Sequence, residues 1–416
     1  MKIAILGSGG REHALEWKFS QSVGAENVFV IPGNGGTKNN VAIDINDFEA
    51  VKTFCEAENV ELIFVGPEAP LVGGIVDYFK NQNSSIKVFG PSQKAAMLEG
   101  SKIWSKKFMQ QYGVATADFW VFEDTEAAKR KIEELGGDLV IKYDGLAGGK
   151  GVYVCDNVAE ALESLEELQS NYGADAEFLI ETKLIGQEIS IIGFTDGQTT
   201  KLLHPSQDHK QLLDGDKGPN TGGMGAYCPV PWCDAPMLHD IINAVVLPTM
   251  DGLQAENLDY TGVIYFGLMM TDEGPKLLEY NARFGDPETE VLLPALKSDL
   301  LQLVLACFED YLADFPLKLE DGYFVDVVLT AEGYPKKYEK GHEITGFDQV
   351  SEHALVFHAG TKREESGEVL TNGGRVMNIV GRGEDLATAI EAAYTEVSKV
   401  QFEGAFYRND IGNRPK

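Results

Sequence analysis

The stretch DLVIKYDGLAGGKGVYVC, residues 138–155, places a glycine-rich loop and Lys150 between two β-rich runs. Glycine-rich loops that carry a lysine often cradle phosphates, but the P-loop pattern G-x-x-x-x-G-K-S/T fails here twice. Asp144 stands where the first glycine belongs, and Gly151 replaces the Ser or Thr. A P-loop also opens into a helix, whereas residues 151–155 form a β-rich run. The stretch therefore predicts a strand–loop–strand flap that can close over a polyphosphate, with a plain β-hairpin as the alternative.

On the N-terminal side of the flap, strand and helix patterns alternate along the chain. Alternation of this kind predicts an open parallel sheet with helices on both faces. We expect this sheet to end near Ser92. The expected strands with their loops are residues 2–6, 27–36, 61–71 and 86–92, and the expected helices are 11–22, 47–60 and 72–82.

The rest of the chain predicts smaller mixed units. Residues 93–113 have the pattern of one long helical connection, and a small α+β module surrounds the flap. Apolar strands and helices follow, and the last segment has the order strand, strand, strand, helix. The expected units are an α/β N-terminal domain (1–100), the connecting helix with the flap subdomain (101–190), a core subdomain (191–321) and a small mixed α+β C-terminal domain (322–416).

The composition limits the classes of partner. The chain has 416 residues, of which 24% are charged and 44% hydrophobic, and its formal net charge is -30. These values are typical of a soluble globular protein. Such a charge argues against nucleic acid or an anionic membrane as the main partner, because both would be repelled. An anionic substrate would need a locally basic pocket.

The cysteines and the apolar runs predict a cytoplasmic location. Five cysteines are scattered along the chain, so we expect neither a disulfide framework nor a zinc site, as in a reducing cytosol. The first apolar run is too short for a signal peptide. No apolar stretch approaches the ~18 residues of a membrane span.

The run GSGGREHAL, residues 7–15, follows the first expected strand. A dinucleotide fingerprint would need a glycine at Glu12 and an acidic residue after the second strand, where residues 32–36 read PGNGG. Dinucleotide binding is therefore disfavoured. Glycine amides beside Arg11 at a helix start could hold a single phosphate, although a tight turn explains the run equally well. Polar loops after the second and third strands favour a ligand site at this sheet edge.

The run LLEYNARFGDPETE, residues 277–290, offers a candidate metal site. On a strand, Glu279 and Asn281 point to the same face. A carboxylate and an amide oxygen there would suit magnesium or manganese shared with substrate phosphates. Arg283 continues on that side and could neutralise charge on a transferring phosphoryl group.

The segment SQDHKQLLDGDKGPNTGGMGAY, residues 206–227, is too long and polar for an incidental connection. Long loops inside compact domains are usually functional or disordered, and we expect this one to be functional. His209 has no Ser or Cys nucleophile beside it, so no catalytic triad is expected. A hydrogen-bonded loop histidine is the favoured interpretation of His209.

Together these runs closely resemble one family, the ATP-grasp ligases, and within it the glycinamide ribonucleotide synthetases. The similarity follows the family order from residue 7 to residue 376 and covers nearly the whole chain. The succession of GPNTGGMGAY at 218–227 and RFGDPETE at 283–290 is highly specific. The other matching runs are GSGGREHAL, PGNGGT, VGPEAPLVGGIVD, FGPSQKAAMLEGSK, DGLAGGKGV, SQDHK, HAGT and TNGGRV.

The resemblance implies a Rossmann-like N-terminal domain, an ATP-grasp unit with a flap and a small C-terminal domain. It also implies that ATP, glycine and 5-phosphoribosylamine give ADP, phosphate and glycinamide ribonucleotide, with Mg²⁺ or Mn²⁺ as cofactor. The glycine carboxylate would attack the γ-phosphate, and the amine would then displace phosphate from the acyl phosphate. Catalysis would rest on positioning and charge neutralisation. The partners would be small molecules, and a monomer is expected.

The resemblance also assigns residues by position. The metal ligands would be Glu279 and Asn281, and Arg283 would stabilise the acyl phosphate. Residues expected to bind ATP are Lys102, Lys142, the flap at 145–152 with Gly145, Gly149, Lys150 and Gly151, the hinge from Glu181 to Leu184, and Glu188 on the ribose. Asp208 and Lys210, toward the acceptor, are expected to be catalytic together with Arg283. Residues expected to bind the phosphoribosylamine are Gly9, Gly10, Arg11, Gly33, Asn34, Asp214, Asn220, Thr221 and Gly222.

The chain departs from the family pattern at four positions. Tyr143 and Gly148 stand where the family has alanines, and Thr182 and Lys183 change the usual hinge. Tyr143 is expected to add bulk beside the nucleotide, and Gly148 to loosen the flap. Three alternatives remain open: an ATP-grasp ligase with another acceptor, a nucleotide-binding module without catalysis, and a nicotinamide dehydrogenase.

Overall fold

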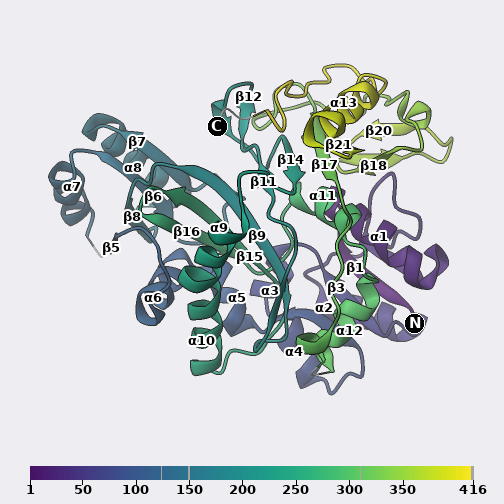
Figure 1. The fold of residues 1–416 in the computed structure, drawn as a ribbon, viewed down its shortest axis with the longest axis horizontal. Coiled ribbons are helices and arrows are strands. Elements are labelled where there is room, and N and C mark those ends of the chain that lie inside the picture. Colours follow the sequence, from purple (N-terminus) through teal and green to yellow (C-terminus); the bar gives the residue numbers. More distant parts are fainter. Residues whose placement is uncertain (123, 149, 310, 414–416) are drawn as a thin grey trace.

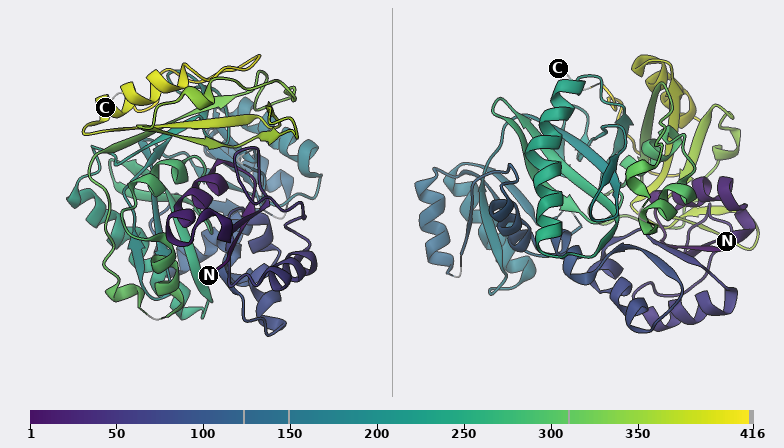
Figure 2. Two further views of the ribbon diagram at one scale, coloured as in Figure 1. Left: turned by 90° about the vertical axis from the view of Figure 1, so that its right-hand side faces the viewer. Right: turned by 60° about the horizontal axis from the view of Figure 1, so that its bottom comes forward.

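The computed structural model describes residues 1–122, 124–148, 150–309 and 311–413 (Figure 1). The segment with β5 to β8, α7 and α8 forms a lobe on one side of the molecule, and the C-terminal segment lies on another (Figure 1). The turned views show the same separation and place the N-terminal segment beside the C-terminal one (Figure 2).

The N-terminal segment forms the expected parallel sheet, in the order β2-β1-β3-β4. Its apolar residues alternate between two helical layers. Ile3 and Ile5 pack with the helices α1 and α12, and Ala4 and Leu6 pack with α2 and α4. Both faces are therefore covered, as predicted. The elements are β1 (Ile3–Gly7), α1 (Gly10–Val23), β2 (Val28–Pro32), α2 (Phe48–Glu58), β3 (Leu62–Val65), α3 (Glu68–Val72), α4 (Ile75–Asn81) and β4 (Lys87–Pro91).

This sheet does not end at Ser92, where the sequence analysis placed its edge. β15 (Tyr260–Thr271) continues it by pairing antiparallel with β4, Tyr260 opposite Pro91. Beyond β15 the order is β9 (Gln187–Thr195) and β10 (Thr200–Leu202), while β16 (Gly274–Asn281) also pairs with β15. The N-terminal and core units therefore share one sheet. Sequence patterns cannot show this, because the paired strands lie far apart in the chain.

The helical connection expected over residues 93–113 is present, but it is broken into two helices. The chain forms α5 (Gln93–Gly100) and α6 (Lys102–Tyr112), separated by Ser101. Ser101 is extended, with φ -136°, and its hydroxyl accepts a hydrogen bond from the Trp104 amide at 3.0 Å. A serine N-cap of this kind begins a new helix. The break makes Lys102 the first residue of α6.

The flap subdomain is the predicted α+β module. Its antiparallel sheet has the order β5-β8-β6-β7, and its own core includes Leu139, Ile141 and Ile180. The opening stretch is confirmed as strand, loop, strand. The elements are β5 (Phe119–Val121), α7 (Thr125–Glu134), β6 (Asp138–Tyr143), β7 (Val152–Asp156), α8 (Val158–Tyr172) and β8 (Phe178–Thr182).

The segment 206–227, predicted as a loop, contains four short strands. β14 (Gly225–Cys228) joins the C-terminal sheet by pairing with β17 (Tyr323–Thr330). The sheet order is β11-β14-β17-β21-β18, so it crosses the expected boundary at 321 and 322. The other elements here are β11 (Gln207–Asp208), the hairpin β12 (Gln211–Leu213) and β13 (Lys217–Asn220), β18 (Ala354–His358), the hairpin β19 (Thr361–Arg363) and β20 (Val369–Thr371), β21 (Arg375–Gly383) and α13 (Leu386–Val397).

Helices of the core segment cover the remaining sheet surfaces. One of the apolar helices expected after the flap subdomain is present as α9 (Ala235–Ile241), a π-helical turn (Ile242–Val246) and α10 (Leu247–Ala255). α11 (Glu288–Ala295) packs between α1, β14 and β17, and α12 (Leu300–Phe308) packs against α1. In the described part of the chain, no helix combines the length and apolar character needed to cross a membrane.

Candidate active site

A cavity of about 400 Å³ lies where the parallel sheet, the flap subdomain, β16 and the C-terminal domain meet. It is the place where the sequence-predicted residues converge. Its lining includes Arg11, Lys102, Lys142, Gly145, Gly151, Glu181, Asp208, Lys210, Thr221, Gly222, Glu279, Asn281 and Arg283.

Glu279 and Asn281 both line the cavity, as their spacing on β16 predicts. They stand opposite Gly267 and Tyr265 of β15. Within the described residues there is no group of three or more His, Cys, Asp or Glu side chains that could hold a metal. One carboxylate and one amide oxygen fit a divalent cation that takes its remaining ligands from substrate phosphates.

Arg283 lies beside this pair and is already held by two carboxylates. Its Nη2 is 2.8 Å from Glu99 Oε1, and its Nε is 3.2 Å from Glu68 Oε2. Burial raises the pKa of Glu99 to about 7, against the opposing charge of Arg283. Burial would also raise the pKa of Glu68, but Arg283 and Arg11 outweigh it and hold that pKa below its ordinary value. Arg283 is thus positioned rigidly, with part of its charge compensated.

Lys102 joins helix α6 to the flap. Its ammonium donates to the Gly145 carbonyl at 2.9 Å, and burial lowers its pKa. Asp144, at the base of the flap, accepts from the Ser101 hydroxyl at 2.9 Å and from the Ile103 amide at 2.9 Å. The start of α6 therefore fixes the flap base.

Lys142 and Glu181 lie at the floor of the cavity and contact each other. Lys142 Nζ is 3.0 Å from Glu181 Oε1 and donates to the Leu278 carbonyl at 3.1 Å. A third residue, Lys106, was not singled out from the sequence. Its Nζ is 3.2 Å from Glu181 Oε2, and burial lowers its pKa to about 8. The signal that could have found it is its position one helical turn after Lys102, on the same face of α6.

The flap loop is only partly inside the lining. Gly145 and Gly151 border the cavity, whereas Lys150 is exposed and Gly149 lies outside the described residues. Tyr143, which was expected to add bulk beside the nucleotide, is not in the cavity lining. Its ring instead stacks on Tyr172 at the end of α8, with 3.9 Å between ring centroids and 9° between planes.

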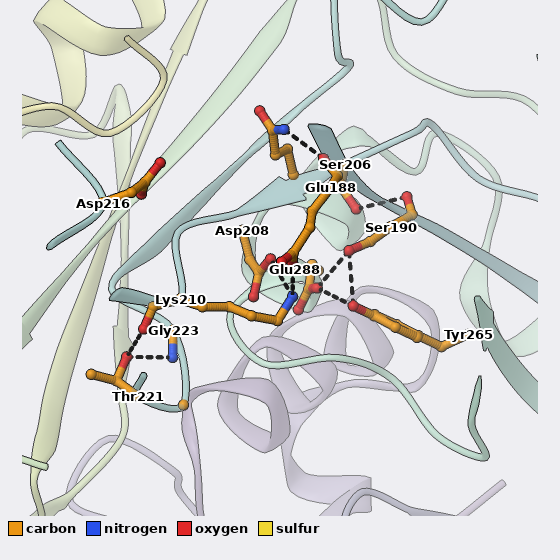
Figure 3. Close-up of polar contacts among 12 residues, drawn as sticks. Glu188, Ser190, Ser206, Asp208, Lys210, Asp216, Thr221, Gly223, Tyr265 and Glu288 are labelled. Carbon is orange, nitrogen blue, oxygen red and sulfur yellow. Dashed lines mark hydrogen bonds and ion pairs between the residues drawn. The ribbon is translucent and has the colours of Figure 1, made fainter. Parts of the chain in front are cut away.

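A polar cluster closes the cavity on the side of β9 and β11 (Figure 3). Lys210 Nζ lies 2.7 Å from Glu188 Oε2 and 3.0 Å from Asp208 Oδ1. Burial opposes charge on Lys210, but these two carboxylates hold its pKa well above the ordinary value. The sequence analysis expected Glu188 to bind the ribose of ATP. The structure pairs it with Lys210 and does not place it in the lining.

Glu288, the first residue of α11, belongs to the same cluster and was not predicted. Its Oε1 accepts from the Ser190 hydroxyl at 2.9 Å and from the Tyr265 hydroxyl at 3.0 Å (Figure 3). Burial and the nearby Asp208 carboxylate raise the pKa of Glu288. The partners of Glu288 lie about a hundred residues away or on another strand, so no sequence pattern joins them.

At the start of α1, only Arg11 reaches the lining. Gly9 is the N-cap, and a Cβ on Gly10 would come within 2.2 Å of Asn378. Asn34 is buried, and its amide donates to the Ser8 carbonyl at 3.0 Å and the His358 carbonyl at 2.7 Å. Gly33, with φ +76°, makes the turn before it. These glycines and Asn34 shape and brace the loop and are not in the lining.

Of the predicted residues after β12, some line the cavity and others do not. Thr221 and Gly222 line the cavity together with Arg375, which sequence analysis did not assign. Arg375 Nη1 donates to the Gly222 carbonyl at 2.7 Å and lies 3.0 Å from Asp286 Oδ1. Three other predicted residues are not in the lining: Asp214, which accepts from the Asn409 amide at 2.8 Å, Asn220, which is exposed, and the hinge residue Leu184.

Comparison with known families matches three models to consecutive parts of the chain. They are the phosphoribosylglycinamide synthetase N domain at residues 1–99, its ATP-grasp (A) domain at 100–289 and its C domain at 324–414. Together they cover nearly all of the described residues.

Curated relatives agree with these matches. The phosphoribosylamine–glycine ligase of Halalkalibacterium halodurans is 45% identical over 420 residues, covering 100% of this chain and 97% of the relative. The trifunctional purine biosynthetic protein adenosine-3 of Homo sapiens is 45% identical over 426 residues, covering 99% of this chain and 42% of that protein.

Solved structures show the same fold. The crystal structure of phosphoribosylamine–glycine ligase from Thermotoga maritima has a TM-score of 0.84 at 37% identity, covering 99% of this chain and 100% of that one. N5-carboxyaminoimidazole ribonucleotide synthetase from Thermus thermophilus, at 18% identity and a TM-score of 0.66, shares the fold alone.

Proposed function

The chain belongs to the phosphoribosylglycinamide synthetase family, and on this premise we propose how its cavity carries out the family's ligation. The enzyme is an ATP-dependent carbon–nitrogen ligase of purine biosynthesis. It joins glycine to 5-phospho-D-ribosylamine and yields glycinamide ribonucleotide, ADP and phosphate. One observation carries the assignment of the site: a single cavity unites Glu279 and Asn281, the phosphate lysines Lys102 and Lys142, and Arg11.

In the first step, a carboxylate oxygen of glycine attacks the γ-phosphorus of ATP. The bond from that phosphorus to its bridging oxygen breaks, and ADP leaves with the electron pair. Lys102, Lys142 and Arg283 hold the phosphates and stabilise charge on the transferring group. Glu279 and Asn281 would hold a magnesium or manganese ion, which neutralises phosphate charge when bound.

In the second step, the amine nitrogen of phosphoribosylamine attacks the acyl carbon of glycyl phosphate. The carbon–oxygen bond to phosphate breaks, phosphate leaves, and the nitrogen loses one proton. Asp208 and Glu288 are cavity carboxylates that can receive this proton. No covalent enzyme intermediate is required, which agrees with the positioning role of the cavity.

The phosphate of phosphoribosylamine is assigned to the loop at Gly9 and Gly10, with Arg11 as its charged contact. The N-terminus of α1 supplies a favourable dipole there, while the Gly9 amide itself donates to Glu12 Oε2 at 2.6 Å. The glycines act by allowing close packing, because side chains of Glu290 and Asn378 lie directly against Gly10.

We further infer a cytoplasmic monomer. The free cysteines agree with a reducing compartment. Size-exclusion chromatography with light scattering across a range of concentrations tests the monomer.

A coupled ADP-release assay tests the reaction. We expect ADP release to require glycine, phosphoribosylamine and a divalent metal together, and other amino acids to substitute poorly. The same assay compares the rate of ADP release with magnesium to the rate with manganese. Equal ATP consumption with and without glycine would contradict the proposed function. Full activity without phosphoribosylamine, when another amine is supplied, would favour an ATP-grasp ligase with a different acceptor.

A further inference from the structure

Lys106 is a buried lysine that the steps above do not use. It lies on α6, is 2% exposed and borders the cavity. A buried ammonium group is costly unless it is paired, so its partners indicate what it does. Those partners are Glu181 and Thr116.

The contacts of Lys106 close a ring through the floor of the cavity. Lys106 Nζ lies 3.2 Å from Glu181 Oε2, and the other oxygen of Glu181 lies 3.0 Å from Lys142 Nζ. On the opposite side, Lys106 donates to the Thr116 hydroxyl, which donates to the Leu277 carbonyl. Lys142 donates to the next carbonyl along β16, that of Leu278, at 3.1 Å, so the ring closes through the backbone of Leu278. The ring thus joins α6, β8, β6 and β16.

Two features of this ring bear on ATP. Lys142 is one of the proposed phosphate lysines, and an ammonium group has three N–H donors. After its contacts with Glu181 and the Leu278 carbonyl, it keeps donor capacity for a ligand in the cavity. Leu278 also directly precedes Glu279, a proposed metal ligand. The ring therefore fixes the lysine and the metal-bearing strand relative to each other.

The net charge of the ring determines how strongly it attracts a phosphate in the cavity. Without Lys106, Glu181 and Lys142 would form a neutral buried pair, because Glu181 would neutralise the charge of Lys142. With Lys106 present, the group of three carries a net positive charge facing the cavity. Opposite charges attract strongly at short range when water is excluded, so the net positive charge of this group attracts the phosphates of ATP.

We propose that Lys106 is a positioning residue for ATP: through Glu181, and through Thr116 and the Leu277–Leu278 segment of β16, it holds Lys142 in place and leaves the Lys142 charge available to the phosphates. This inference rests on the proposed function, because it assumes that ATP phosphates occupy this cavity.

The test compares Lys106→Met with Lys107→Met, a matched change on the exposed neighbouring lysine of the same helix. We expect the Lys106→Met KM for ATP to rise roughly ten- to hundred-fold, as for the loss of a charged hydrogen-bonded group. Its KM for glycine should stay within about two-fold of the wild-type value, and Lys107→Met should resemble the wild type. An equal KM for ATP in both variants would overturn the proposal.

A double-substitution cycle separates positioning from general damage to the fold. If Lys106 acts by compensating Glu181, Lys106→Met should weaken ATP binding much less in a Glu181→Gln background than in the wild type. Strict additivity of the two changes would contradict this role. If Lys106→Met fails to fold, Thr116→Val breaks the other arm of the ring, and a KM for ATP unchanged in that variant would overturn the proposal. Absence of glycine-dependent ADP release in the wild type would instead contradict the proposed function.

Discussion

Glu279 is the single residue on which the proposed metal site depends most. Replacing it by alanine removes the only carboxylate offered by β16 at the cavity, so we expect kcat to fall roughly 10²- to 10³-fold or more. The side chain is half-buried and lies at a strand end, so the free energy of unfolding should change by less than ~1 kcal/mol.

Glu273→Ala is the control, since Glu273 lies in the turn of the same hairpin and its side chain is 82% exposed. ADP release and thermal unfolding are measured for both variants. Activity of Glu279→Ala comparable to that of Glu273→Ala would remove Glu279 from the metal site.

A buried acid pair beneath α1 makes stability depend on pH. Glu290 and Asp326 are fully buried, and among the described residues one oxygen of Glu290 and both oxygens of Asp326 have no hydrogen-bond partner. Burial, together with mutual repulsion and the charge of Asp286, raises the pKa of Glu290 well above its ordinary value, and Arg375 only partly opposes this. Burial raises the pKa of Asp326 likewise.

Because these folded-state pKa values lie above the unfolded ones, the native state binds more protons than the unfolded state. The stabilising contribution is complete below the unfolded pKa values, near 4, and is lost as the pH rises through the folded ones. We expect the free energy of unfolding to fall with rising pH by up to ~1.4 kcal/mol per unit for each proton held. Glu290→Gln should flatten this slope and gain stability at pH 8. Urea unfolding between pH 5.5 and 8.5 measures how the free energy of unfolding depends on pH. Glu391→Gln, a change at an exposed residue, is the control. A pH slope in Glu290→Gln equal to that of the wild type would refute the expectation.

At the residue level, sequence reasoning found side chains that belong to contiguous motifs. Glu279, Asn281, Arg283 and Lys142 all line the cavity as predicted. Sequence reasoning missed Glu99, Glu288 and Arg375, because each owes its place to a partner on a distant segment, and it missed Lys106 although that residue follows Lys102 by one helical turn. The Glu99 carboxylate, for example, pairs with Arg283 across the interface of α5 and β16.

At the scale of elements, the flap was predictable because local pattern decides it. Failure of the P-loop pattern and the β-rich run after Gly151 together required strand, loop, strand. The break at Ser101 was also local, but helical periodicity on both sides concealed the cap. The pairing of β4 with β15 and of β14 with β17 was not predictable, since these ladders join residues more than 90 positions apart.

The Tyr143 ring holds the base of the flap. It stacks on Tyr172, and Cβ atoms built on Gly145 and Gly151 would lie 2.9 Å and 3.0 Å from Tyr143. Tyr143→Ala removes a stack worth about 0.5–1.5 kcal/mol and frees the loop. We expect a KM for ATP raised a few-fold and faster proteolysis within residues 144–151. Tyr153→Ala, on β7, is the control, and equal cleavage rates in both variants would show that the stack does not hold the flap.

For the molecule as a whole, the sheets indicate which parts unfold together. One continuous sheet joins the N-terminal and core units through β4 and β15, and the C-terminal sheet takes β14 from the core. In the described residues the flap sheet, β5-β8-β6-β7, forms no ladder with either, and it has a separate core. Parts joined by shared ladders and packed cores open cooperatively, whereas a unit with its own core can open alone.

We therefore expect native-state hydrogen exchange to show two levels of protection. Amides of β6, β7 and β8 should exchange through an opening of lower free energy than those of β1, β9, β15 and β17, which should share one higher value. The flap subdomain is attached to the rest largely through α6, where Asp144 binds Ser101 and Lys106 meets Glu181. ATP with magnesium, bound between the flap and β16, should raise protection of the flap strands toward that of the core, since a ligand bound only by the closed form stabilises it. A single protection level for all these strands, unchanged by nucleotide, would show that the flap subdomain is not an independent unit.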